Sequence, residues 1–263
     1  MFFASSFQGA ASGLAYGNFL IQAPLGILSN SLILPLLTKF SKLKSDKKYV
    51  KLGNNLTTAI EYCFLTTIFL TTFFITFNNQ IVQLVFERGA FDFRAVNEVR
   101  KILIAYSVGI PFYLYRDLLV RTYYSIEKTK LPFKLSLLGI LLNIFFDWIL
   151  IRVLAPYNLE IEGIILSSAA VNFIICCILS INLKNHNLSL PSSLLLAKIL
   201  LISLSALITG YICLSIFQTV PQINTLIGKL FVLILESLTF FIIYFLITKF
   251  LKVNNFKIYQ KKI

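Results

Sequence analysis

The chain has 263 residues, of which 57% are hydrophobic and 13% are charged, and its mean hydropathy is +0.82. A water-soluble domain of this length cannot cover so much apolar surface, so the composition indicates an integral membrane protein. The formal net charge of +13 first suggests nucleic-acid binding, but the basic residues form short clusters between apolar runs. That arrangement is typical of membrane topology signals. We therefore expect no nucleic-acid partner.

Several apolar runs are long enough, at about 20 residues each, to cross a hydrocarbon layer of about 30 Å. They predict an all-α integral membrane fold, a single bundle of seven transmembrane helices over approximately 9–38, 57–79, 99–124, 132–155, 161–183, 193–217 and 224–250. The first run contains Pro24 and Pro35, for which we expect a kink near Ala23 and a helix end near Pro35. The residues before this run lack a basic region, so we expect no cleavable signal peptide and interpret them as the end of another helix.

Charged loops orient the predicted helices. The connections 39–56 and 121–134 are rich in lysine and arginine, whereas the connections 80–98 and 155–160 are balanced or acidic. Basic loops stay in the cytoplasm. The rule therefore predicts a multi-pass protein of the cell (inner) membrane with its N-terminus outside and its lysine-rich C-terminus in the cytoplasm.

The third apolar run contains three ionisable residues, Arg116, Asp117 and Arg121. An ionisable group at that depth costs at least ~2.5 kcal/mol on insertion scales, so it normally faces a polar cavity or a partner. Asp117 and Arg121 are one helical turn apart and can neutralise each other while reaching toward the headgroup layer. Arg116 then remains as a surplus positive charge, which suits an anionic substrate. We expect all three side chains to face one cavity.

The stretch from Phe86 to Lys134 contains FERGAFD, AYSVGIPFYLYRDLLVRTYYS and KTKLPFK, and YGNFLIQAPLGILSNSLILPLL lies upstream. In their order and spacing these motifs resemble the MurJ (MviN) family of lipid II flippases. The Arg-Asp pair before R-x-Y-Y is similar to the cyanobacterial branch of that family. The resemblance is strong to about position 190 and extends beyond it only as hydropathy.

This resemblance implies a fourteen-helix bundle of two lobes, of which the chain matches the last seven helices. The implied function is half of an alternating-access flippase that moves lipid II, an undecaprenyl-linked peptidoglycan precursor, outward across the membrane for cell-wall synthesis. The implied partners are lipid II, membrane lipids and a separate N-terminal lobe. Two alternatives stay open: a flippase lobe for another polyprenyl-pyrophosphate-linked oligosaccharide, and a membrane remnant or scaffold without transport. No enzyme activity is expected, because the carboxylates are scattered singly.

Polar or small residues of the first helix recur every three to four positions, at Asn18, Gln22, Gly26 and either Ser29 or Asn30. This spacing places them on one helix face. Such a stripe either lines a groove or joins neighbouring helices through hydrogen bonds. The amides Asn18 and Gln22, with the three ionisable residues of the third run, are the candidate substrate-binding residues. The family often carries arginine where this chain has Phe19.

Asn143 and Asp147 are one turn apart on the fourth predicted helix, so an amide oxygen and a carboxylate share one face, as coordination of a hard cation requires. The pair resembles part of the family's sodium site, which the resemblance completes with the Ile164 carbonyl and the Ser168 hydroxyl. A further carboxylate of that site would precede the first residue, so Na+ is expected only as a coupling ion of an assembled protein, and no other cofactor is expected. Arg152 is an alternative partner that would neutralise Asp147.

Overall fold

The computed structural model describes residues 10–86, 93–184, 193–217 and 226–250, and every regular element in these ranges is helical. In chain order they are α1 (Ala10–Leu28), the π-helical turn η2 (Ser29–Ile33), α2 (Leu34–Ser45), α3 (Tyr49–Thr76), α4 (Asn78–Phe86), α5 (Phe93–Ser125), α6 (Lys130–Leu154), the 3-10 turn η3 (Ala155–Tyr157), α7 (Glu160–Lys184), α8 (Ser193–Phe217) and α9 (Leu226–Phe250). The predicted all-α fold is confirmed for this part of the chain.

Six helical stretches are long and apolar enough to cross a membrane, namely Ser12–Ser45, Tyr49–Thr76, Arg94–Ser125, Lys130–Tyr157, Glu160–Leu183 and Gly228–Phe250. A seventh long helix, α8, has 25 residues, of which Ile199–Cys213 forms a shorter apolar helix. The structure therefore contains the seven predicted long helices. Most of the FERGAFD motif, residues 87–92, lies outside the described ranges.

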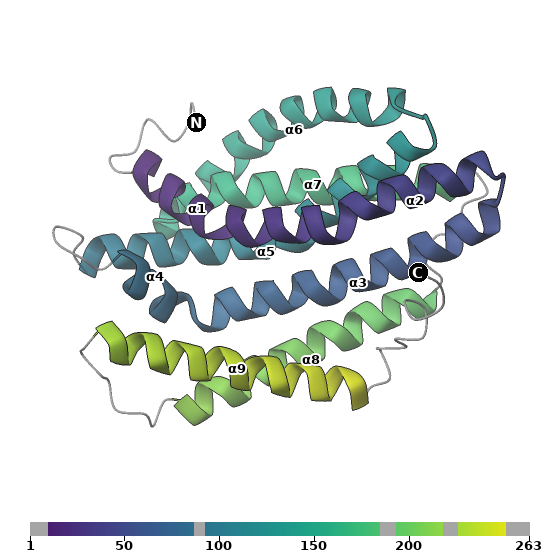
Figure 1. The fold of residues 1–263 in the computed structure, drawn as a ribbon. Coiled ribbons are helices and arrows are strands. Elements are labelled where there is room, and N and C mark those ends of the chain that lie inside the picture. The colour runs from purple at the N-terminus through teal and green to yellow at the C-terminus, as the bar shows by residue number, and fades with distance from the viewer. Residues whose placement is uncertain (1–9, 87–92, 185–192, 218–225, 251–263) are drawn as a thin grey trace.

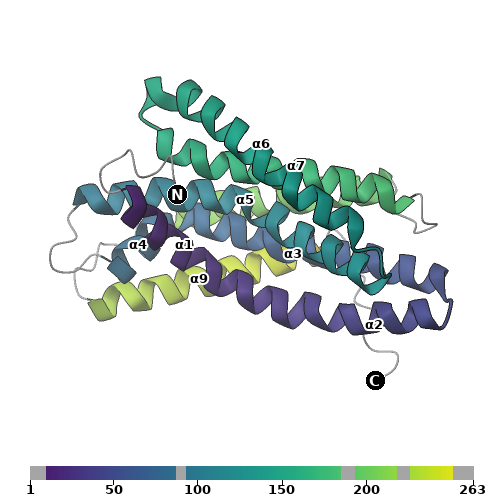
Figure 2. The ribbon, with the colours of Figure 1, turned by 90° about the horizontal axis from the view of Figure 1, so that it is seen from above.

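The helix at the centre of the bundle is α5 (Figure 1), which lies against α1, α2, α3, α4 and α7. On one side of it α6 packs on the outer face of α7, and on the other side α8 and α9 pack beyond α3 (Figures 1 and 2). Most side chains of α6 are exposed, among them Phe133, Leu141 and Trp148. An apolar helix with one packed face suits contact with lipid.

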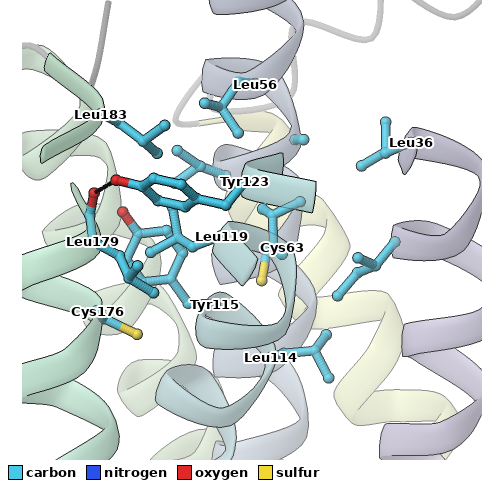
Figure 3. Close-up of a cluster of buried hydrophobic side chains, with 14 of the residues drawn as sticks. Leu36, Leu56, Cys63, Leu114, Tyr115, Leu119, Tyr123, Cys176, Leu179 and Leu183 are labelled. Atoms are coloured by element: carbon cyan, nitrogen blue, oxygen red, sulfur yellow. Dashed lines mark hydrogen bonds between the residues drawn. The ribbon is translucent and has the colours of Figure 1, made fainter. Parts of the chain in front are cut away.

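A large buried cluster lies between α2, α3, α5 and α7 (Figure 3). Tyr123 is completely buried there, and its hydroxyl donates a hydrogen bond of 2.9 Å to the Leu179 carbonyl of α7. Tyr115 places its hydroxyl 2.7 Å from Ser180 Oγ, also on α7. A buried phenol is stable only where its hydroxyl finds a partner. The first tyrosine of the R-x-Y-Y motif is therefore a packing contact between α5 and α7.

The first helix does not end at Pro35, so that expectation was wrong. The chain runs uninterrupted through Ala23 and Pro24 in α1, and after the π turn it continues as α2 to Ser45. Pro35 lies in the first turn of α2, where a missing N–H and a fixed φ are tolerated. The π turn separates the helix into two regular parts, and Pro35, the second residue of α2, does not interrupt the helix.

The spacing of the inward-facing apolar residues explains the π turn. The buried hydrophobic residues of this helix are Leu14 and Ile21 before the turn and Ile33, Leu36 and Phe40 after it. Ile21 and Ile33 are twelve residues apart, a separation that would place them about 120° apart around a regular α-helix. Each residue rotates an α-helix by about 100°. One extra residue in a wider turn therefore keeps both halves facing the bundle.

This account predicts opposite effects for a deletion and an insertion at Ser31, which is exposed. Deleting Ser31 shortens the separation of Ile21 and Ile33 to eleven residues, which places them about 20° apart around a regular helix. The register would be kept, so the free energy of unfolding is expected to change little. Inserting one alanine after Ser31 would turn the inward face of α2 away by about 100°. Losing the packing of even one large core side chain costs roughly 2–5 kcal/mol, so little folded protein is expected. Thermal unfolding and size-exclusion profiles in detergent compare the two, and equal damage would contradict the register argument.

Candidate functional site

A cavity of about 400 Å³, with several polar side chains in its lining, lies between the first helix and α5. It is lined by Asn18, Ile21, Gln22, Leu25, Gly26 and Ser29 from the first helix and by Tyr106, Tyr113, Leu114 and Asp117 from α5. The stripe expected from helical spacing thus lies along one cavity wall, with Ser29 and not Asn30 as its last member. Gln22 Nε2 donates to Asn18 Oδ1 at 3.3 Å. The cavity brings together Asn18, Gln22 and Asp117 of the predicted substrate-binding residues.

Arg121 lies beside this cavity and is linked to two of its lining residues, Ser29 and Asp117, by a closed ring of hydrogen bonds. Its Nε donates to Asp117 Oδ1 at 2.8 Å, and its Nη2 donates to Ser29 Oγ at 3.1 Å. The Ser29 hydroxyl in turn donates to Asp117 Oδ2 at 2.6 Å. The predicted pairing of Asp117 with Arg121 is present, and a serine of the neighbouring helix takes part in it.

Arg116 lies apart from this ring, so the expectation that all three ionisable side chains share one cavity is corrected. Its Nη1 donates to Asn172 Oδ1 of α7 at 2.7 Å, and its Nη2 lies 3.4 Å from Ser136 Oγ of α6. Consecutive helix residues point about 100° apart. Arg116 and Asp117 therefore face different neighbouring helices, and the surplus positive charge lies between α5, α6 and α7.

Two glycines of α1 are expected to respond in opposite ways to alanine. A Cβ atom at Gly17 would lie 2.5 Å from Ile102 Cγ2 of α5, whereas a Cβ atom at Gly26 would meet nothing within 4 Å. Gly17→Ala is expected to lower the free energy of unfolding by roughly 1–3 kcal/mol through overpacking. Gly26→Ala is expected to leave it unchanged or raise it by up to ~1 kcal/mol, because alanine favours the helix. Thermal unfolding of both variants is the measurement, and equal shifts would contradict the close approach of α1 to α5.

A second polar site lies between α6 and α7. The buried Ser167 Oγ contacts Asp147 Oδ1 and lies 2.8 Å from the Ile164 carbonyl oxygen. One turn before Asp147 on α6, Asn143 Oδ1 is buried and has no hydrogen-bond partner within the described ranges. The structure thus brings Asp147 and Ile164 together as predicted, with an unmatched amide oxygen one turn away.

The hydroxyl at this site comes from Ser167, whereas the family resemblance implies Ser168. The Ser168 side chain instead hydrogen-bonds Tyr113 of α5, and its backbone carbonyl accepts a hydrogen bond from Asn172 Nδ2 at 2.7 Å. The adjacent Ser-Ser pair was the available signal, but spacing alone does not say which of two neighbours faces α6. Arg152 also differs from the alternative prediction, because its guanidinium carbon stacks 3.9 Å from the Trp148 ring centroid. It forms no ion pair with Asp147 in the part of the chain that the structure covers.

Six long apolar helices around a cavity with polar side chains define a multi-pass membrane protein. The family model for the lipid II flippase MurJ matches residues 1–248. The chain belongs to this family.

Similar proteins agree with the family match. A probable lipid II flippase MurJ of Synechocystis sp. is 34% identical over 242 residues, which cover 91% of this chain and 44% of that relative. The lipid II flippase MurJ of Thermosipho africanus is 27% identical over 189 residues, 72% of this chain and 39% of that relative. A solved structure, lipid II flippase MurJ in an inward closed conformation, matches with a TM-score of 0.74 and 25% identity over 93% of this chain and 48% of its own. The chain spans less than half the length of these relatives.

Proposed function

We propose that this chain forms the C-terminal part of a lipid II flippase and that the α1–α5 cavity is part of the path of the polar head group. The observation that carries the proposal is the hydrogen-bonding wall formed by Asn18, Gln22 and Ser29 with the Asp117–Arg121 pair, inside an otherwise apolar bundle. Polar groups at such depth normally mark a substrate path. The relatives that share the fold are named lipid II flippases.

Arg121 supplies the chemistry that a pyrophosphate-linked lipid requires. The ring with Asp117 and Ser29 uses one Nε–H and one Nη2–H, and a guanidinium carries five N–H donors in a fixed plane. Three donors therefore remain for phosphate oxygens. Arginine binds phosphate through paired, charge-assisted hydrogen bonds.

A separate N-terminal lobe is proposed to complete the path. Asn18 and Gln22 are exposed at the cavity, and Phe19 and Ile27 on the same helix are 66% and 68% exposed. A cavity of about 400 Å³ has the size of a site for a drug-sized group, which suits a pyrophosphate but not a whole glycopeptide head group. The exposed side of α1 would then face the N-terminal lobe, and the two parts together would form a larger passage.

We also propose that the α6–α7 site holds Na+ in the assembled protein. Asn143, Asp147, Ile164 and Ser167 would provide only oxygen ligands, which suit a hard cation, and the unmatched Asn143 oxygen would gain a partner. One carboxylate balances one monovalent charge. No group of three or more His, Cys, Asp or Glu suited to a metal occurs in the described ranges, so no carboxylate-rich site for a divalent ion is present there.

The proposed orientation places the α2–α3 and α5–α6 connections in the cytoplasm. A salt bridge of 2.6 Å between Lys44 and Glu127 ties these two basic connections together at one end of the bundle, and η3 lies at the other end (Figure 1). Cysteines that replace Lys47 and Glu160 are expected to react with an impermeant maleimide from opposite sides of the membrane, Lys47→Cys from the cytoplasm. Labelling of both from one side would contradict the orientation.

The direct test is reconstitution of transport from two parts. The chain would be expressed with the N-terminal segment that precedes the matched region in the Synechocystis relative, in cells depleted of their own flippase. Restored exposure of lipid II outside the membrane is expected only when both parts are present. If the two parts co-purify at normal levels and no lipid II is exposed, the proposal is wrong. Exposure of a different polyprenyl-pyrophosphate-linked oligosaccharide in the same cells would assign the substrate to that lipid instead.

A further inference from the structure

We infer that Ser29 is a positioning residue for Arg121: its hydroxyl holds the Asp117–Arg121 ion pair partly open, so that the guanidinium stays available beside the cavity that Ser29 and Asp117 line. The inference deepens the proposed function and rests on it only for the identity of the anion. The arrangement of the three side chains carries it independently of any ligand.

An arginine and a carboxylate normally form two parallel N–H to oxygen bonds. Here Arg121 makes one direct bond, from Nε to Asp117 Oδ1 at 2.8 Å. The position of the second bond is taken by the Ser29 hydroxyl, which accepts from Nη2 at 3.1 Å and donates to Oδ2 at 2.6 Å. Ser29 therefore stands between the two charged groups as a spacer.

A hydroxyl suits this position because it donates one hydrogen bond and accepts others at the same atom. A methyl group in its place would leave both Nη2 and Oδ2 without that partner in a half-buried site. Asp117 and Arg121 are four residues apart on one helix, so their side chains can close on each other. The closed, bidentate pair would neutralise Arg121 more completely and turn its donors away from the cavity.

The local backbone explains how Ser29 reaches α5. Ser29 is the first residue of the π turn, and its carbonyl accepts the Leu34 N–H. Single π turns occur frequently at functional sites. One turn earlier, Gly26 has no atom within 4 Å of its Cβ position, so the space beside the ring remains open to the cavity.

The test measures the reactivity of Arg121 in the full chain, reconstituted in nanodiscs of zwitterionic lipid. Phenylglyoxal labels guanidinium groups, and mass spectrometry compares the labelling rate of Arg121 with that of Arg116 in the same sample. A charged hydrogen bond corresponds to about a tenfold change or more in an equilibrium. Ser29→Ala is therefore expected to slow Arg121 labelling about tenfold with the Arg116 rate unchanged, and Ser29→Thr is expected to retain the wild-type rate.

Asp117→Asn provides the matched background, because without a carboxylate the pair cannot close. Asp117→Asn and the double variant Ser29→Ala/Asp117→Asn are expected to label Arg121 at the same fast rate. Unchanged or faster labelling in Ser29→Ala, with a wild-type size-exclusion profile, would overturn the inference. Slow labelling in the double variant would also overturn it, because the effect would then not pass through Asp117.

Inorganic pyrophosphate separates this inference from the proposed function. Protection of Arg121 from phenylglyoxal by pyrophosphate in the wild-type chain supports an anion-binding role. Absence of protection would overturn that role. The rate ratio between Ser29→Ala and wild type still decides the role of Ser29 in either case.

Discussion

Arg121→Ala is expected to reduce lipid II flipping by about tenfold or more when the chain is expressed with an N-terminal lobe. A charge beside a water-poor cavity acts at an effective dielectric constant of ~20, whereas an exposed charge is screened within ~8 Å at physiological salt. Loss of one charge-assisted contact to the substrate costs ~1.5–3 kcal/mol. Arg94→Ala is the matched control, because Arg94 is exposed near the other end of the same helix and loses the same charge. The measurement is lipid II accessible outside cells depleted of their own flippase.

Two further variants separate substrate binding by Arg121 from neutralisation of Asp117. Arg121→Lys is expected to keep part of the activity, since the charge returns without the planar pair of donors. Asp117→Asn/Arg121→Ala removes the carboxylate that the single change would leave unpaired. It is expected to remain as inactive as Arg121→Ala. Recovery of flipping in the double variant would show that Arg121 serves only to neutralise Asp117.

Helical spacing and membrane depth predicted two parts of this site. The three-to-four residue step places Asn18 and Gln22 on one face of α1, and that face lines the cavity. The pairing of Asp117 with Arg121 followed from their separation by one turn. Each of these two relations lies within a single helix, where sequence distance determines geometry.

The positions of Arg116 and Ser167, which the sequence did not predict, depend on the neighbouring helix. Arg116 and Asp117 differ by one position, yet one reaches α7 and the other faces α1. Ser167 and Ser168 differ in the same way. A rotation of a few tens of degrees about the helix axis decides between such neighbours, and that rotation is set by packing against other helices.

The residue spacing that explains the π turn is present in the sequence, but Pro35 was a more obvious signal at the same place. The twelve-residue separation of Ile21 and Ile33 is visible in the printed sequence, but it becomes informative only when both residues are known to be buried. Pro35 instead favoured a helix end. A proline in the first turn of a helix is well tolerated. Because α2 begins at Leu34, directly after the π turn, Pro35 lies in such a first turn.

The second large effect is expected at the α6–α7 site, where Na+ should increase the thermal stability of the protein. If Asp147 binds Na+, replacing choline in the buffer by Na+ at a concentration ten times its Kd should stabilise the assembled protein by about 1.4 kcal/mol. This corresponds to a rise in Tm of roughly 3–6 °C. Asp147→Asn is expected to abolish this shift, because the neutral amide no longer balances the cation. Glu98→Gln, an exposed change on α5, should retain it.

Alanine variants of Ser167 and Ser168 test whether the sodium-dependent shift follows the observed geometry of the site. Ser167 contacts both Asp147 and the Ile164 carbonyl, so Ser167→Ala is expected to weaken the sodium-dependent shift. Ser168→Ala should leave the shift nearly unchanged, since the Ser168 side chain hydrogen-bonds Tyr113 of α5 and not Asp147. A sodium response that survives Asp147→Asn would place the ion elsewhere. A larger loss in Ser168→Ala than in Ser167→Ala would return the hydroxyl ligand to Ser168 and require α7 to rotate when the ion binds.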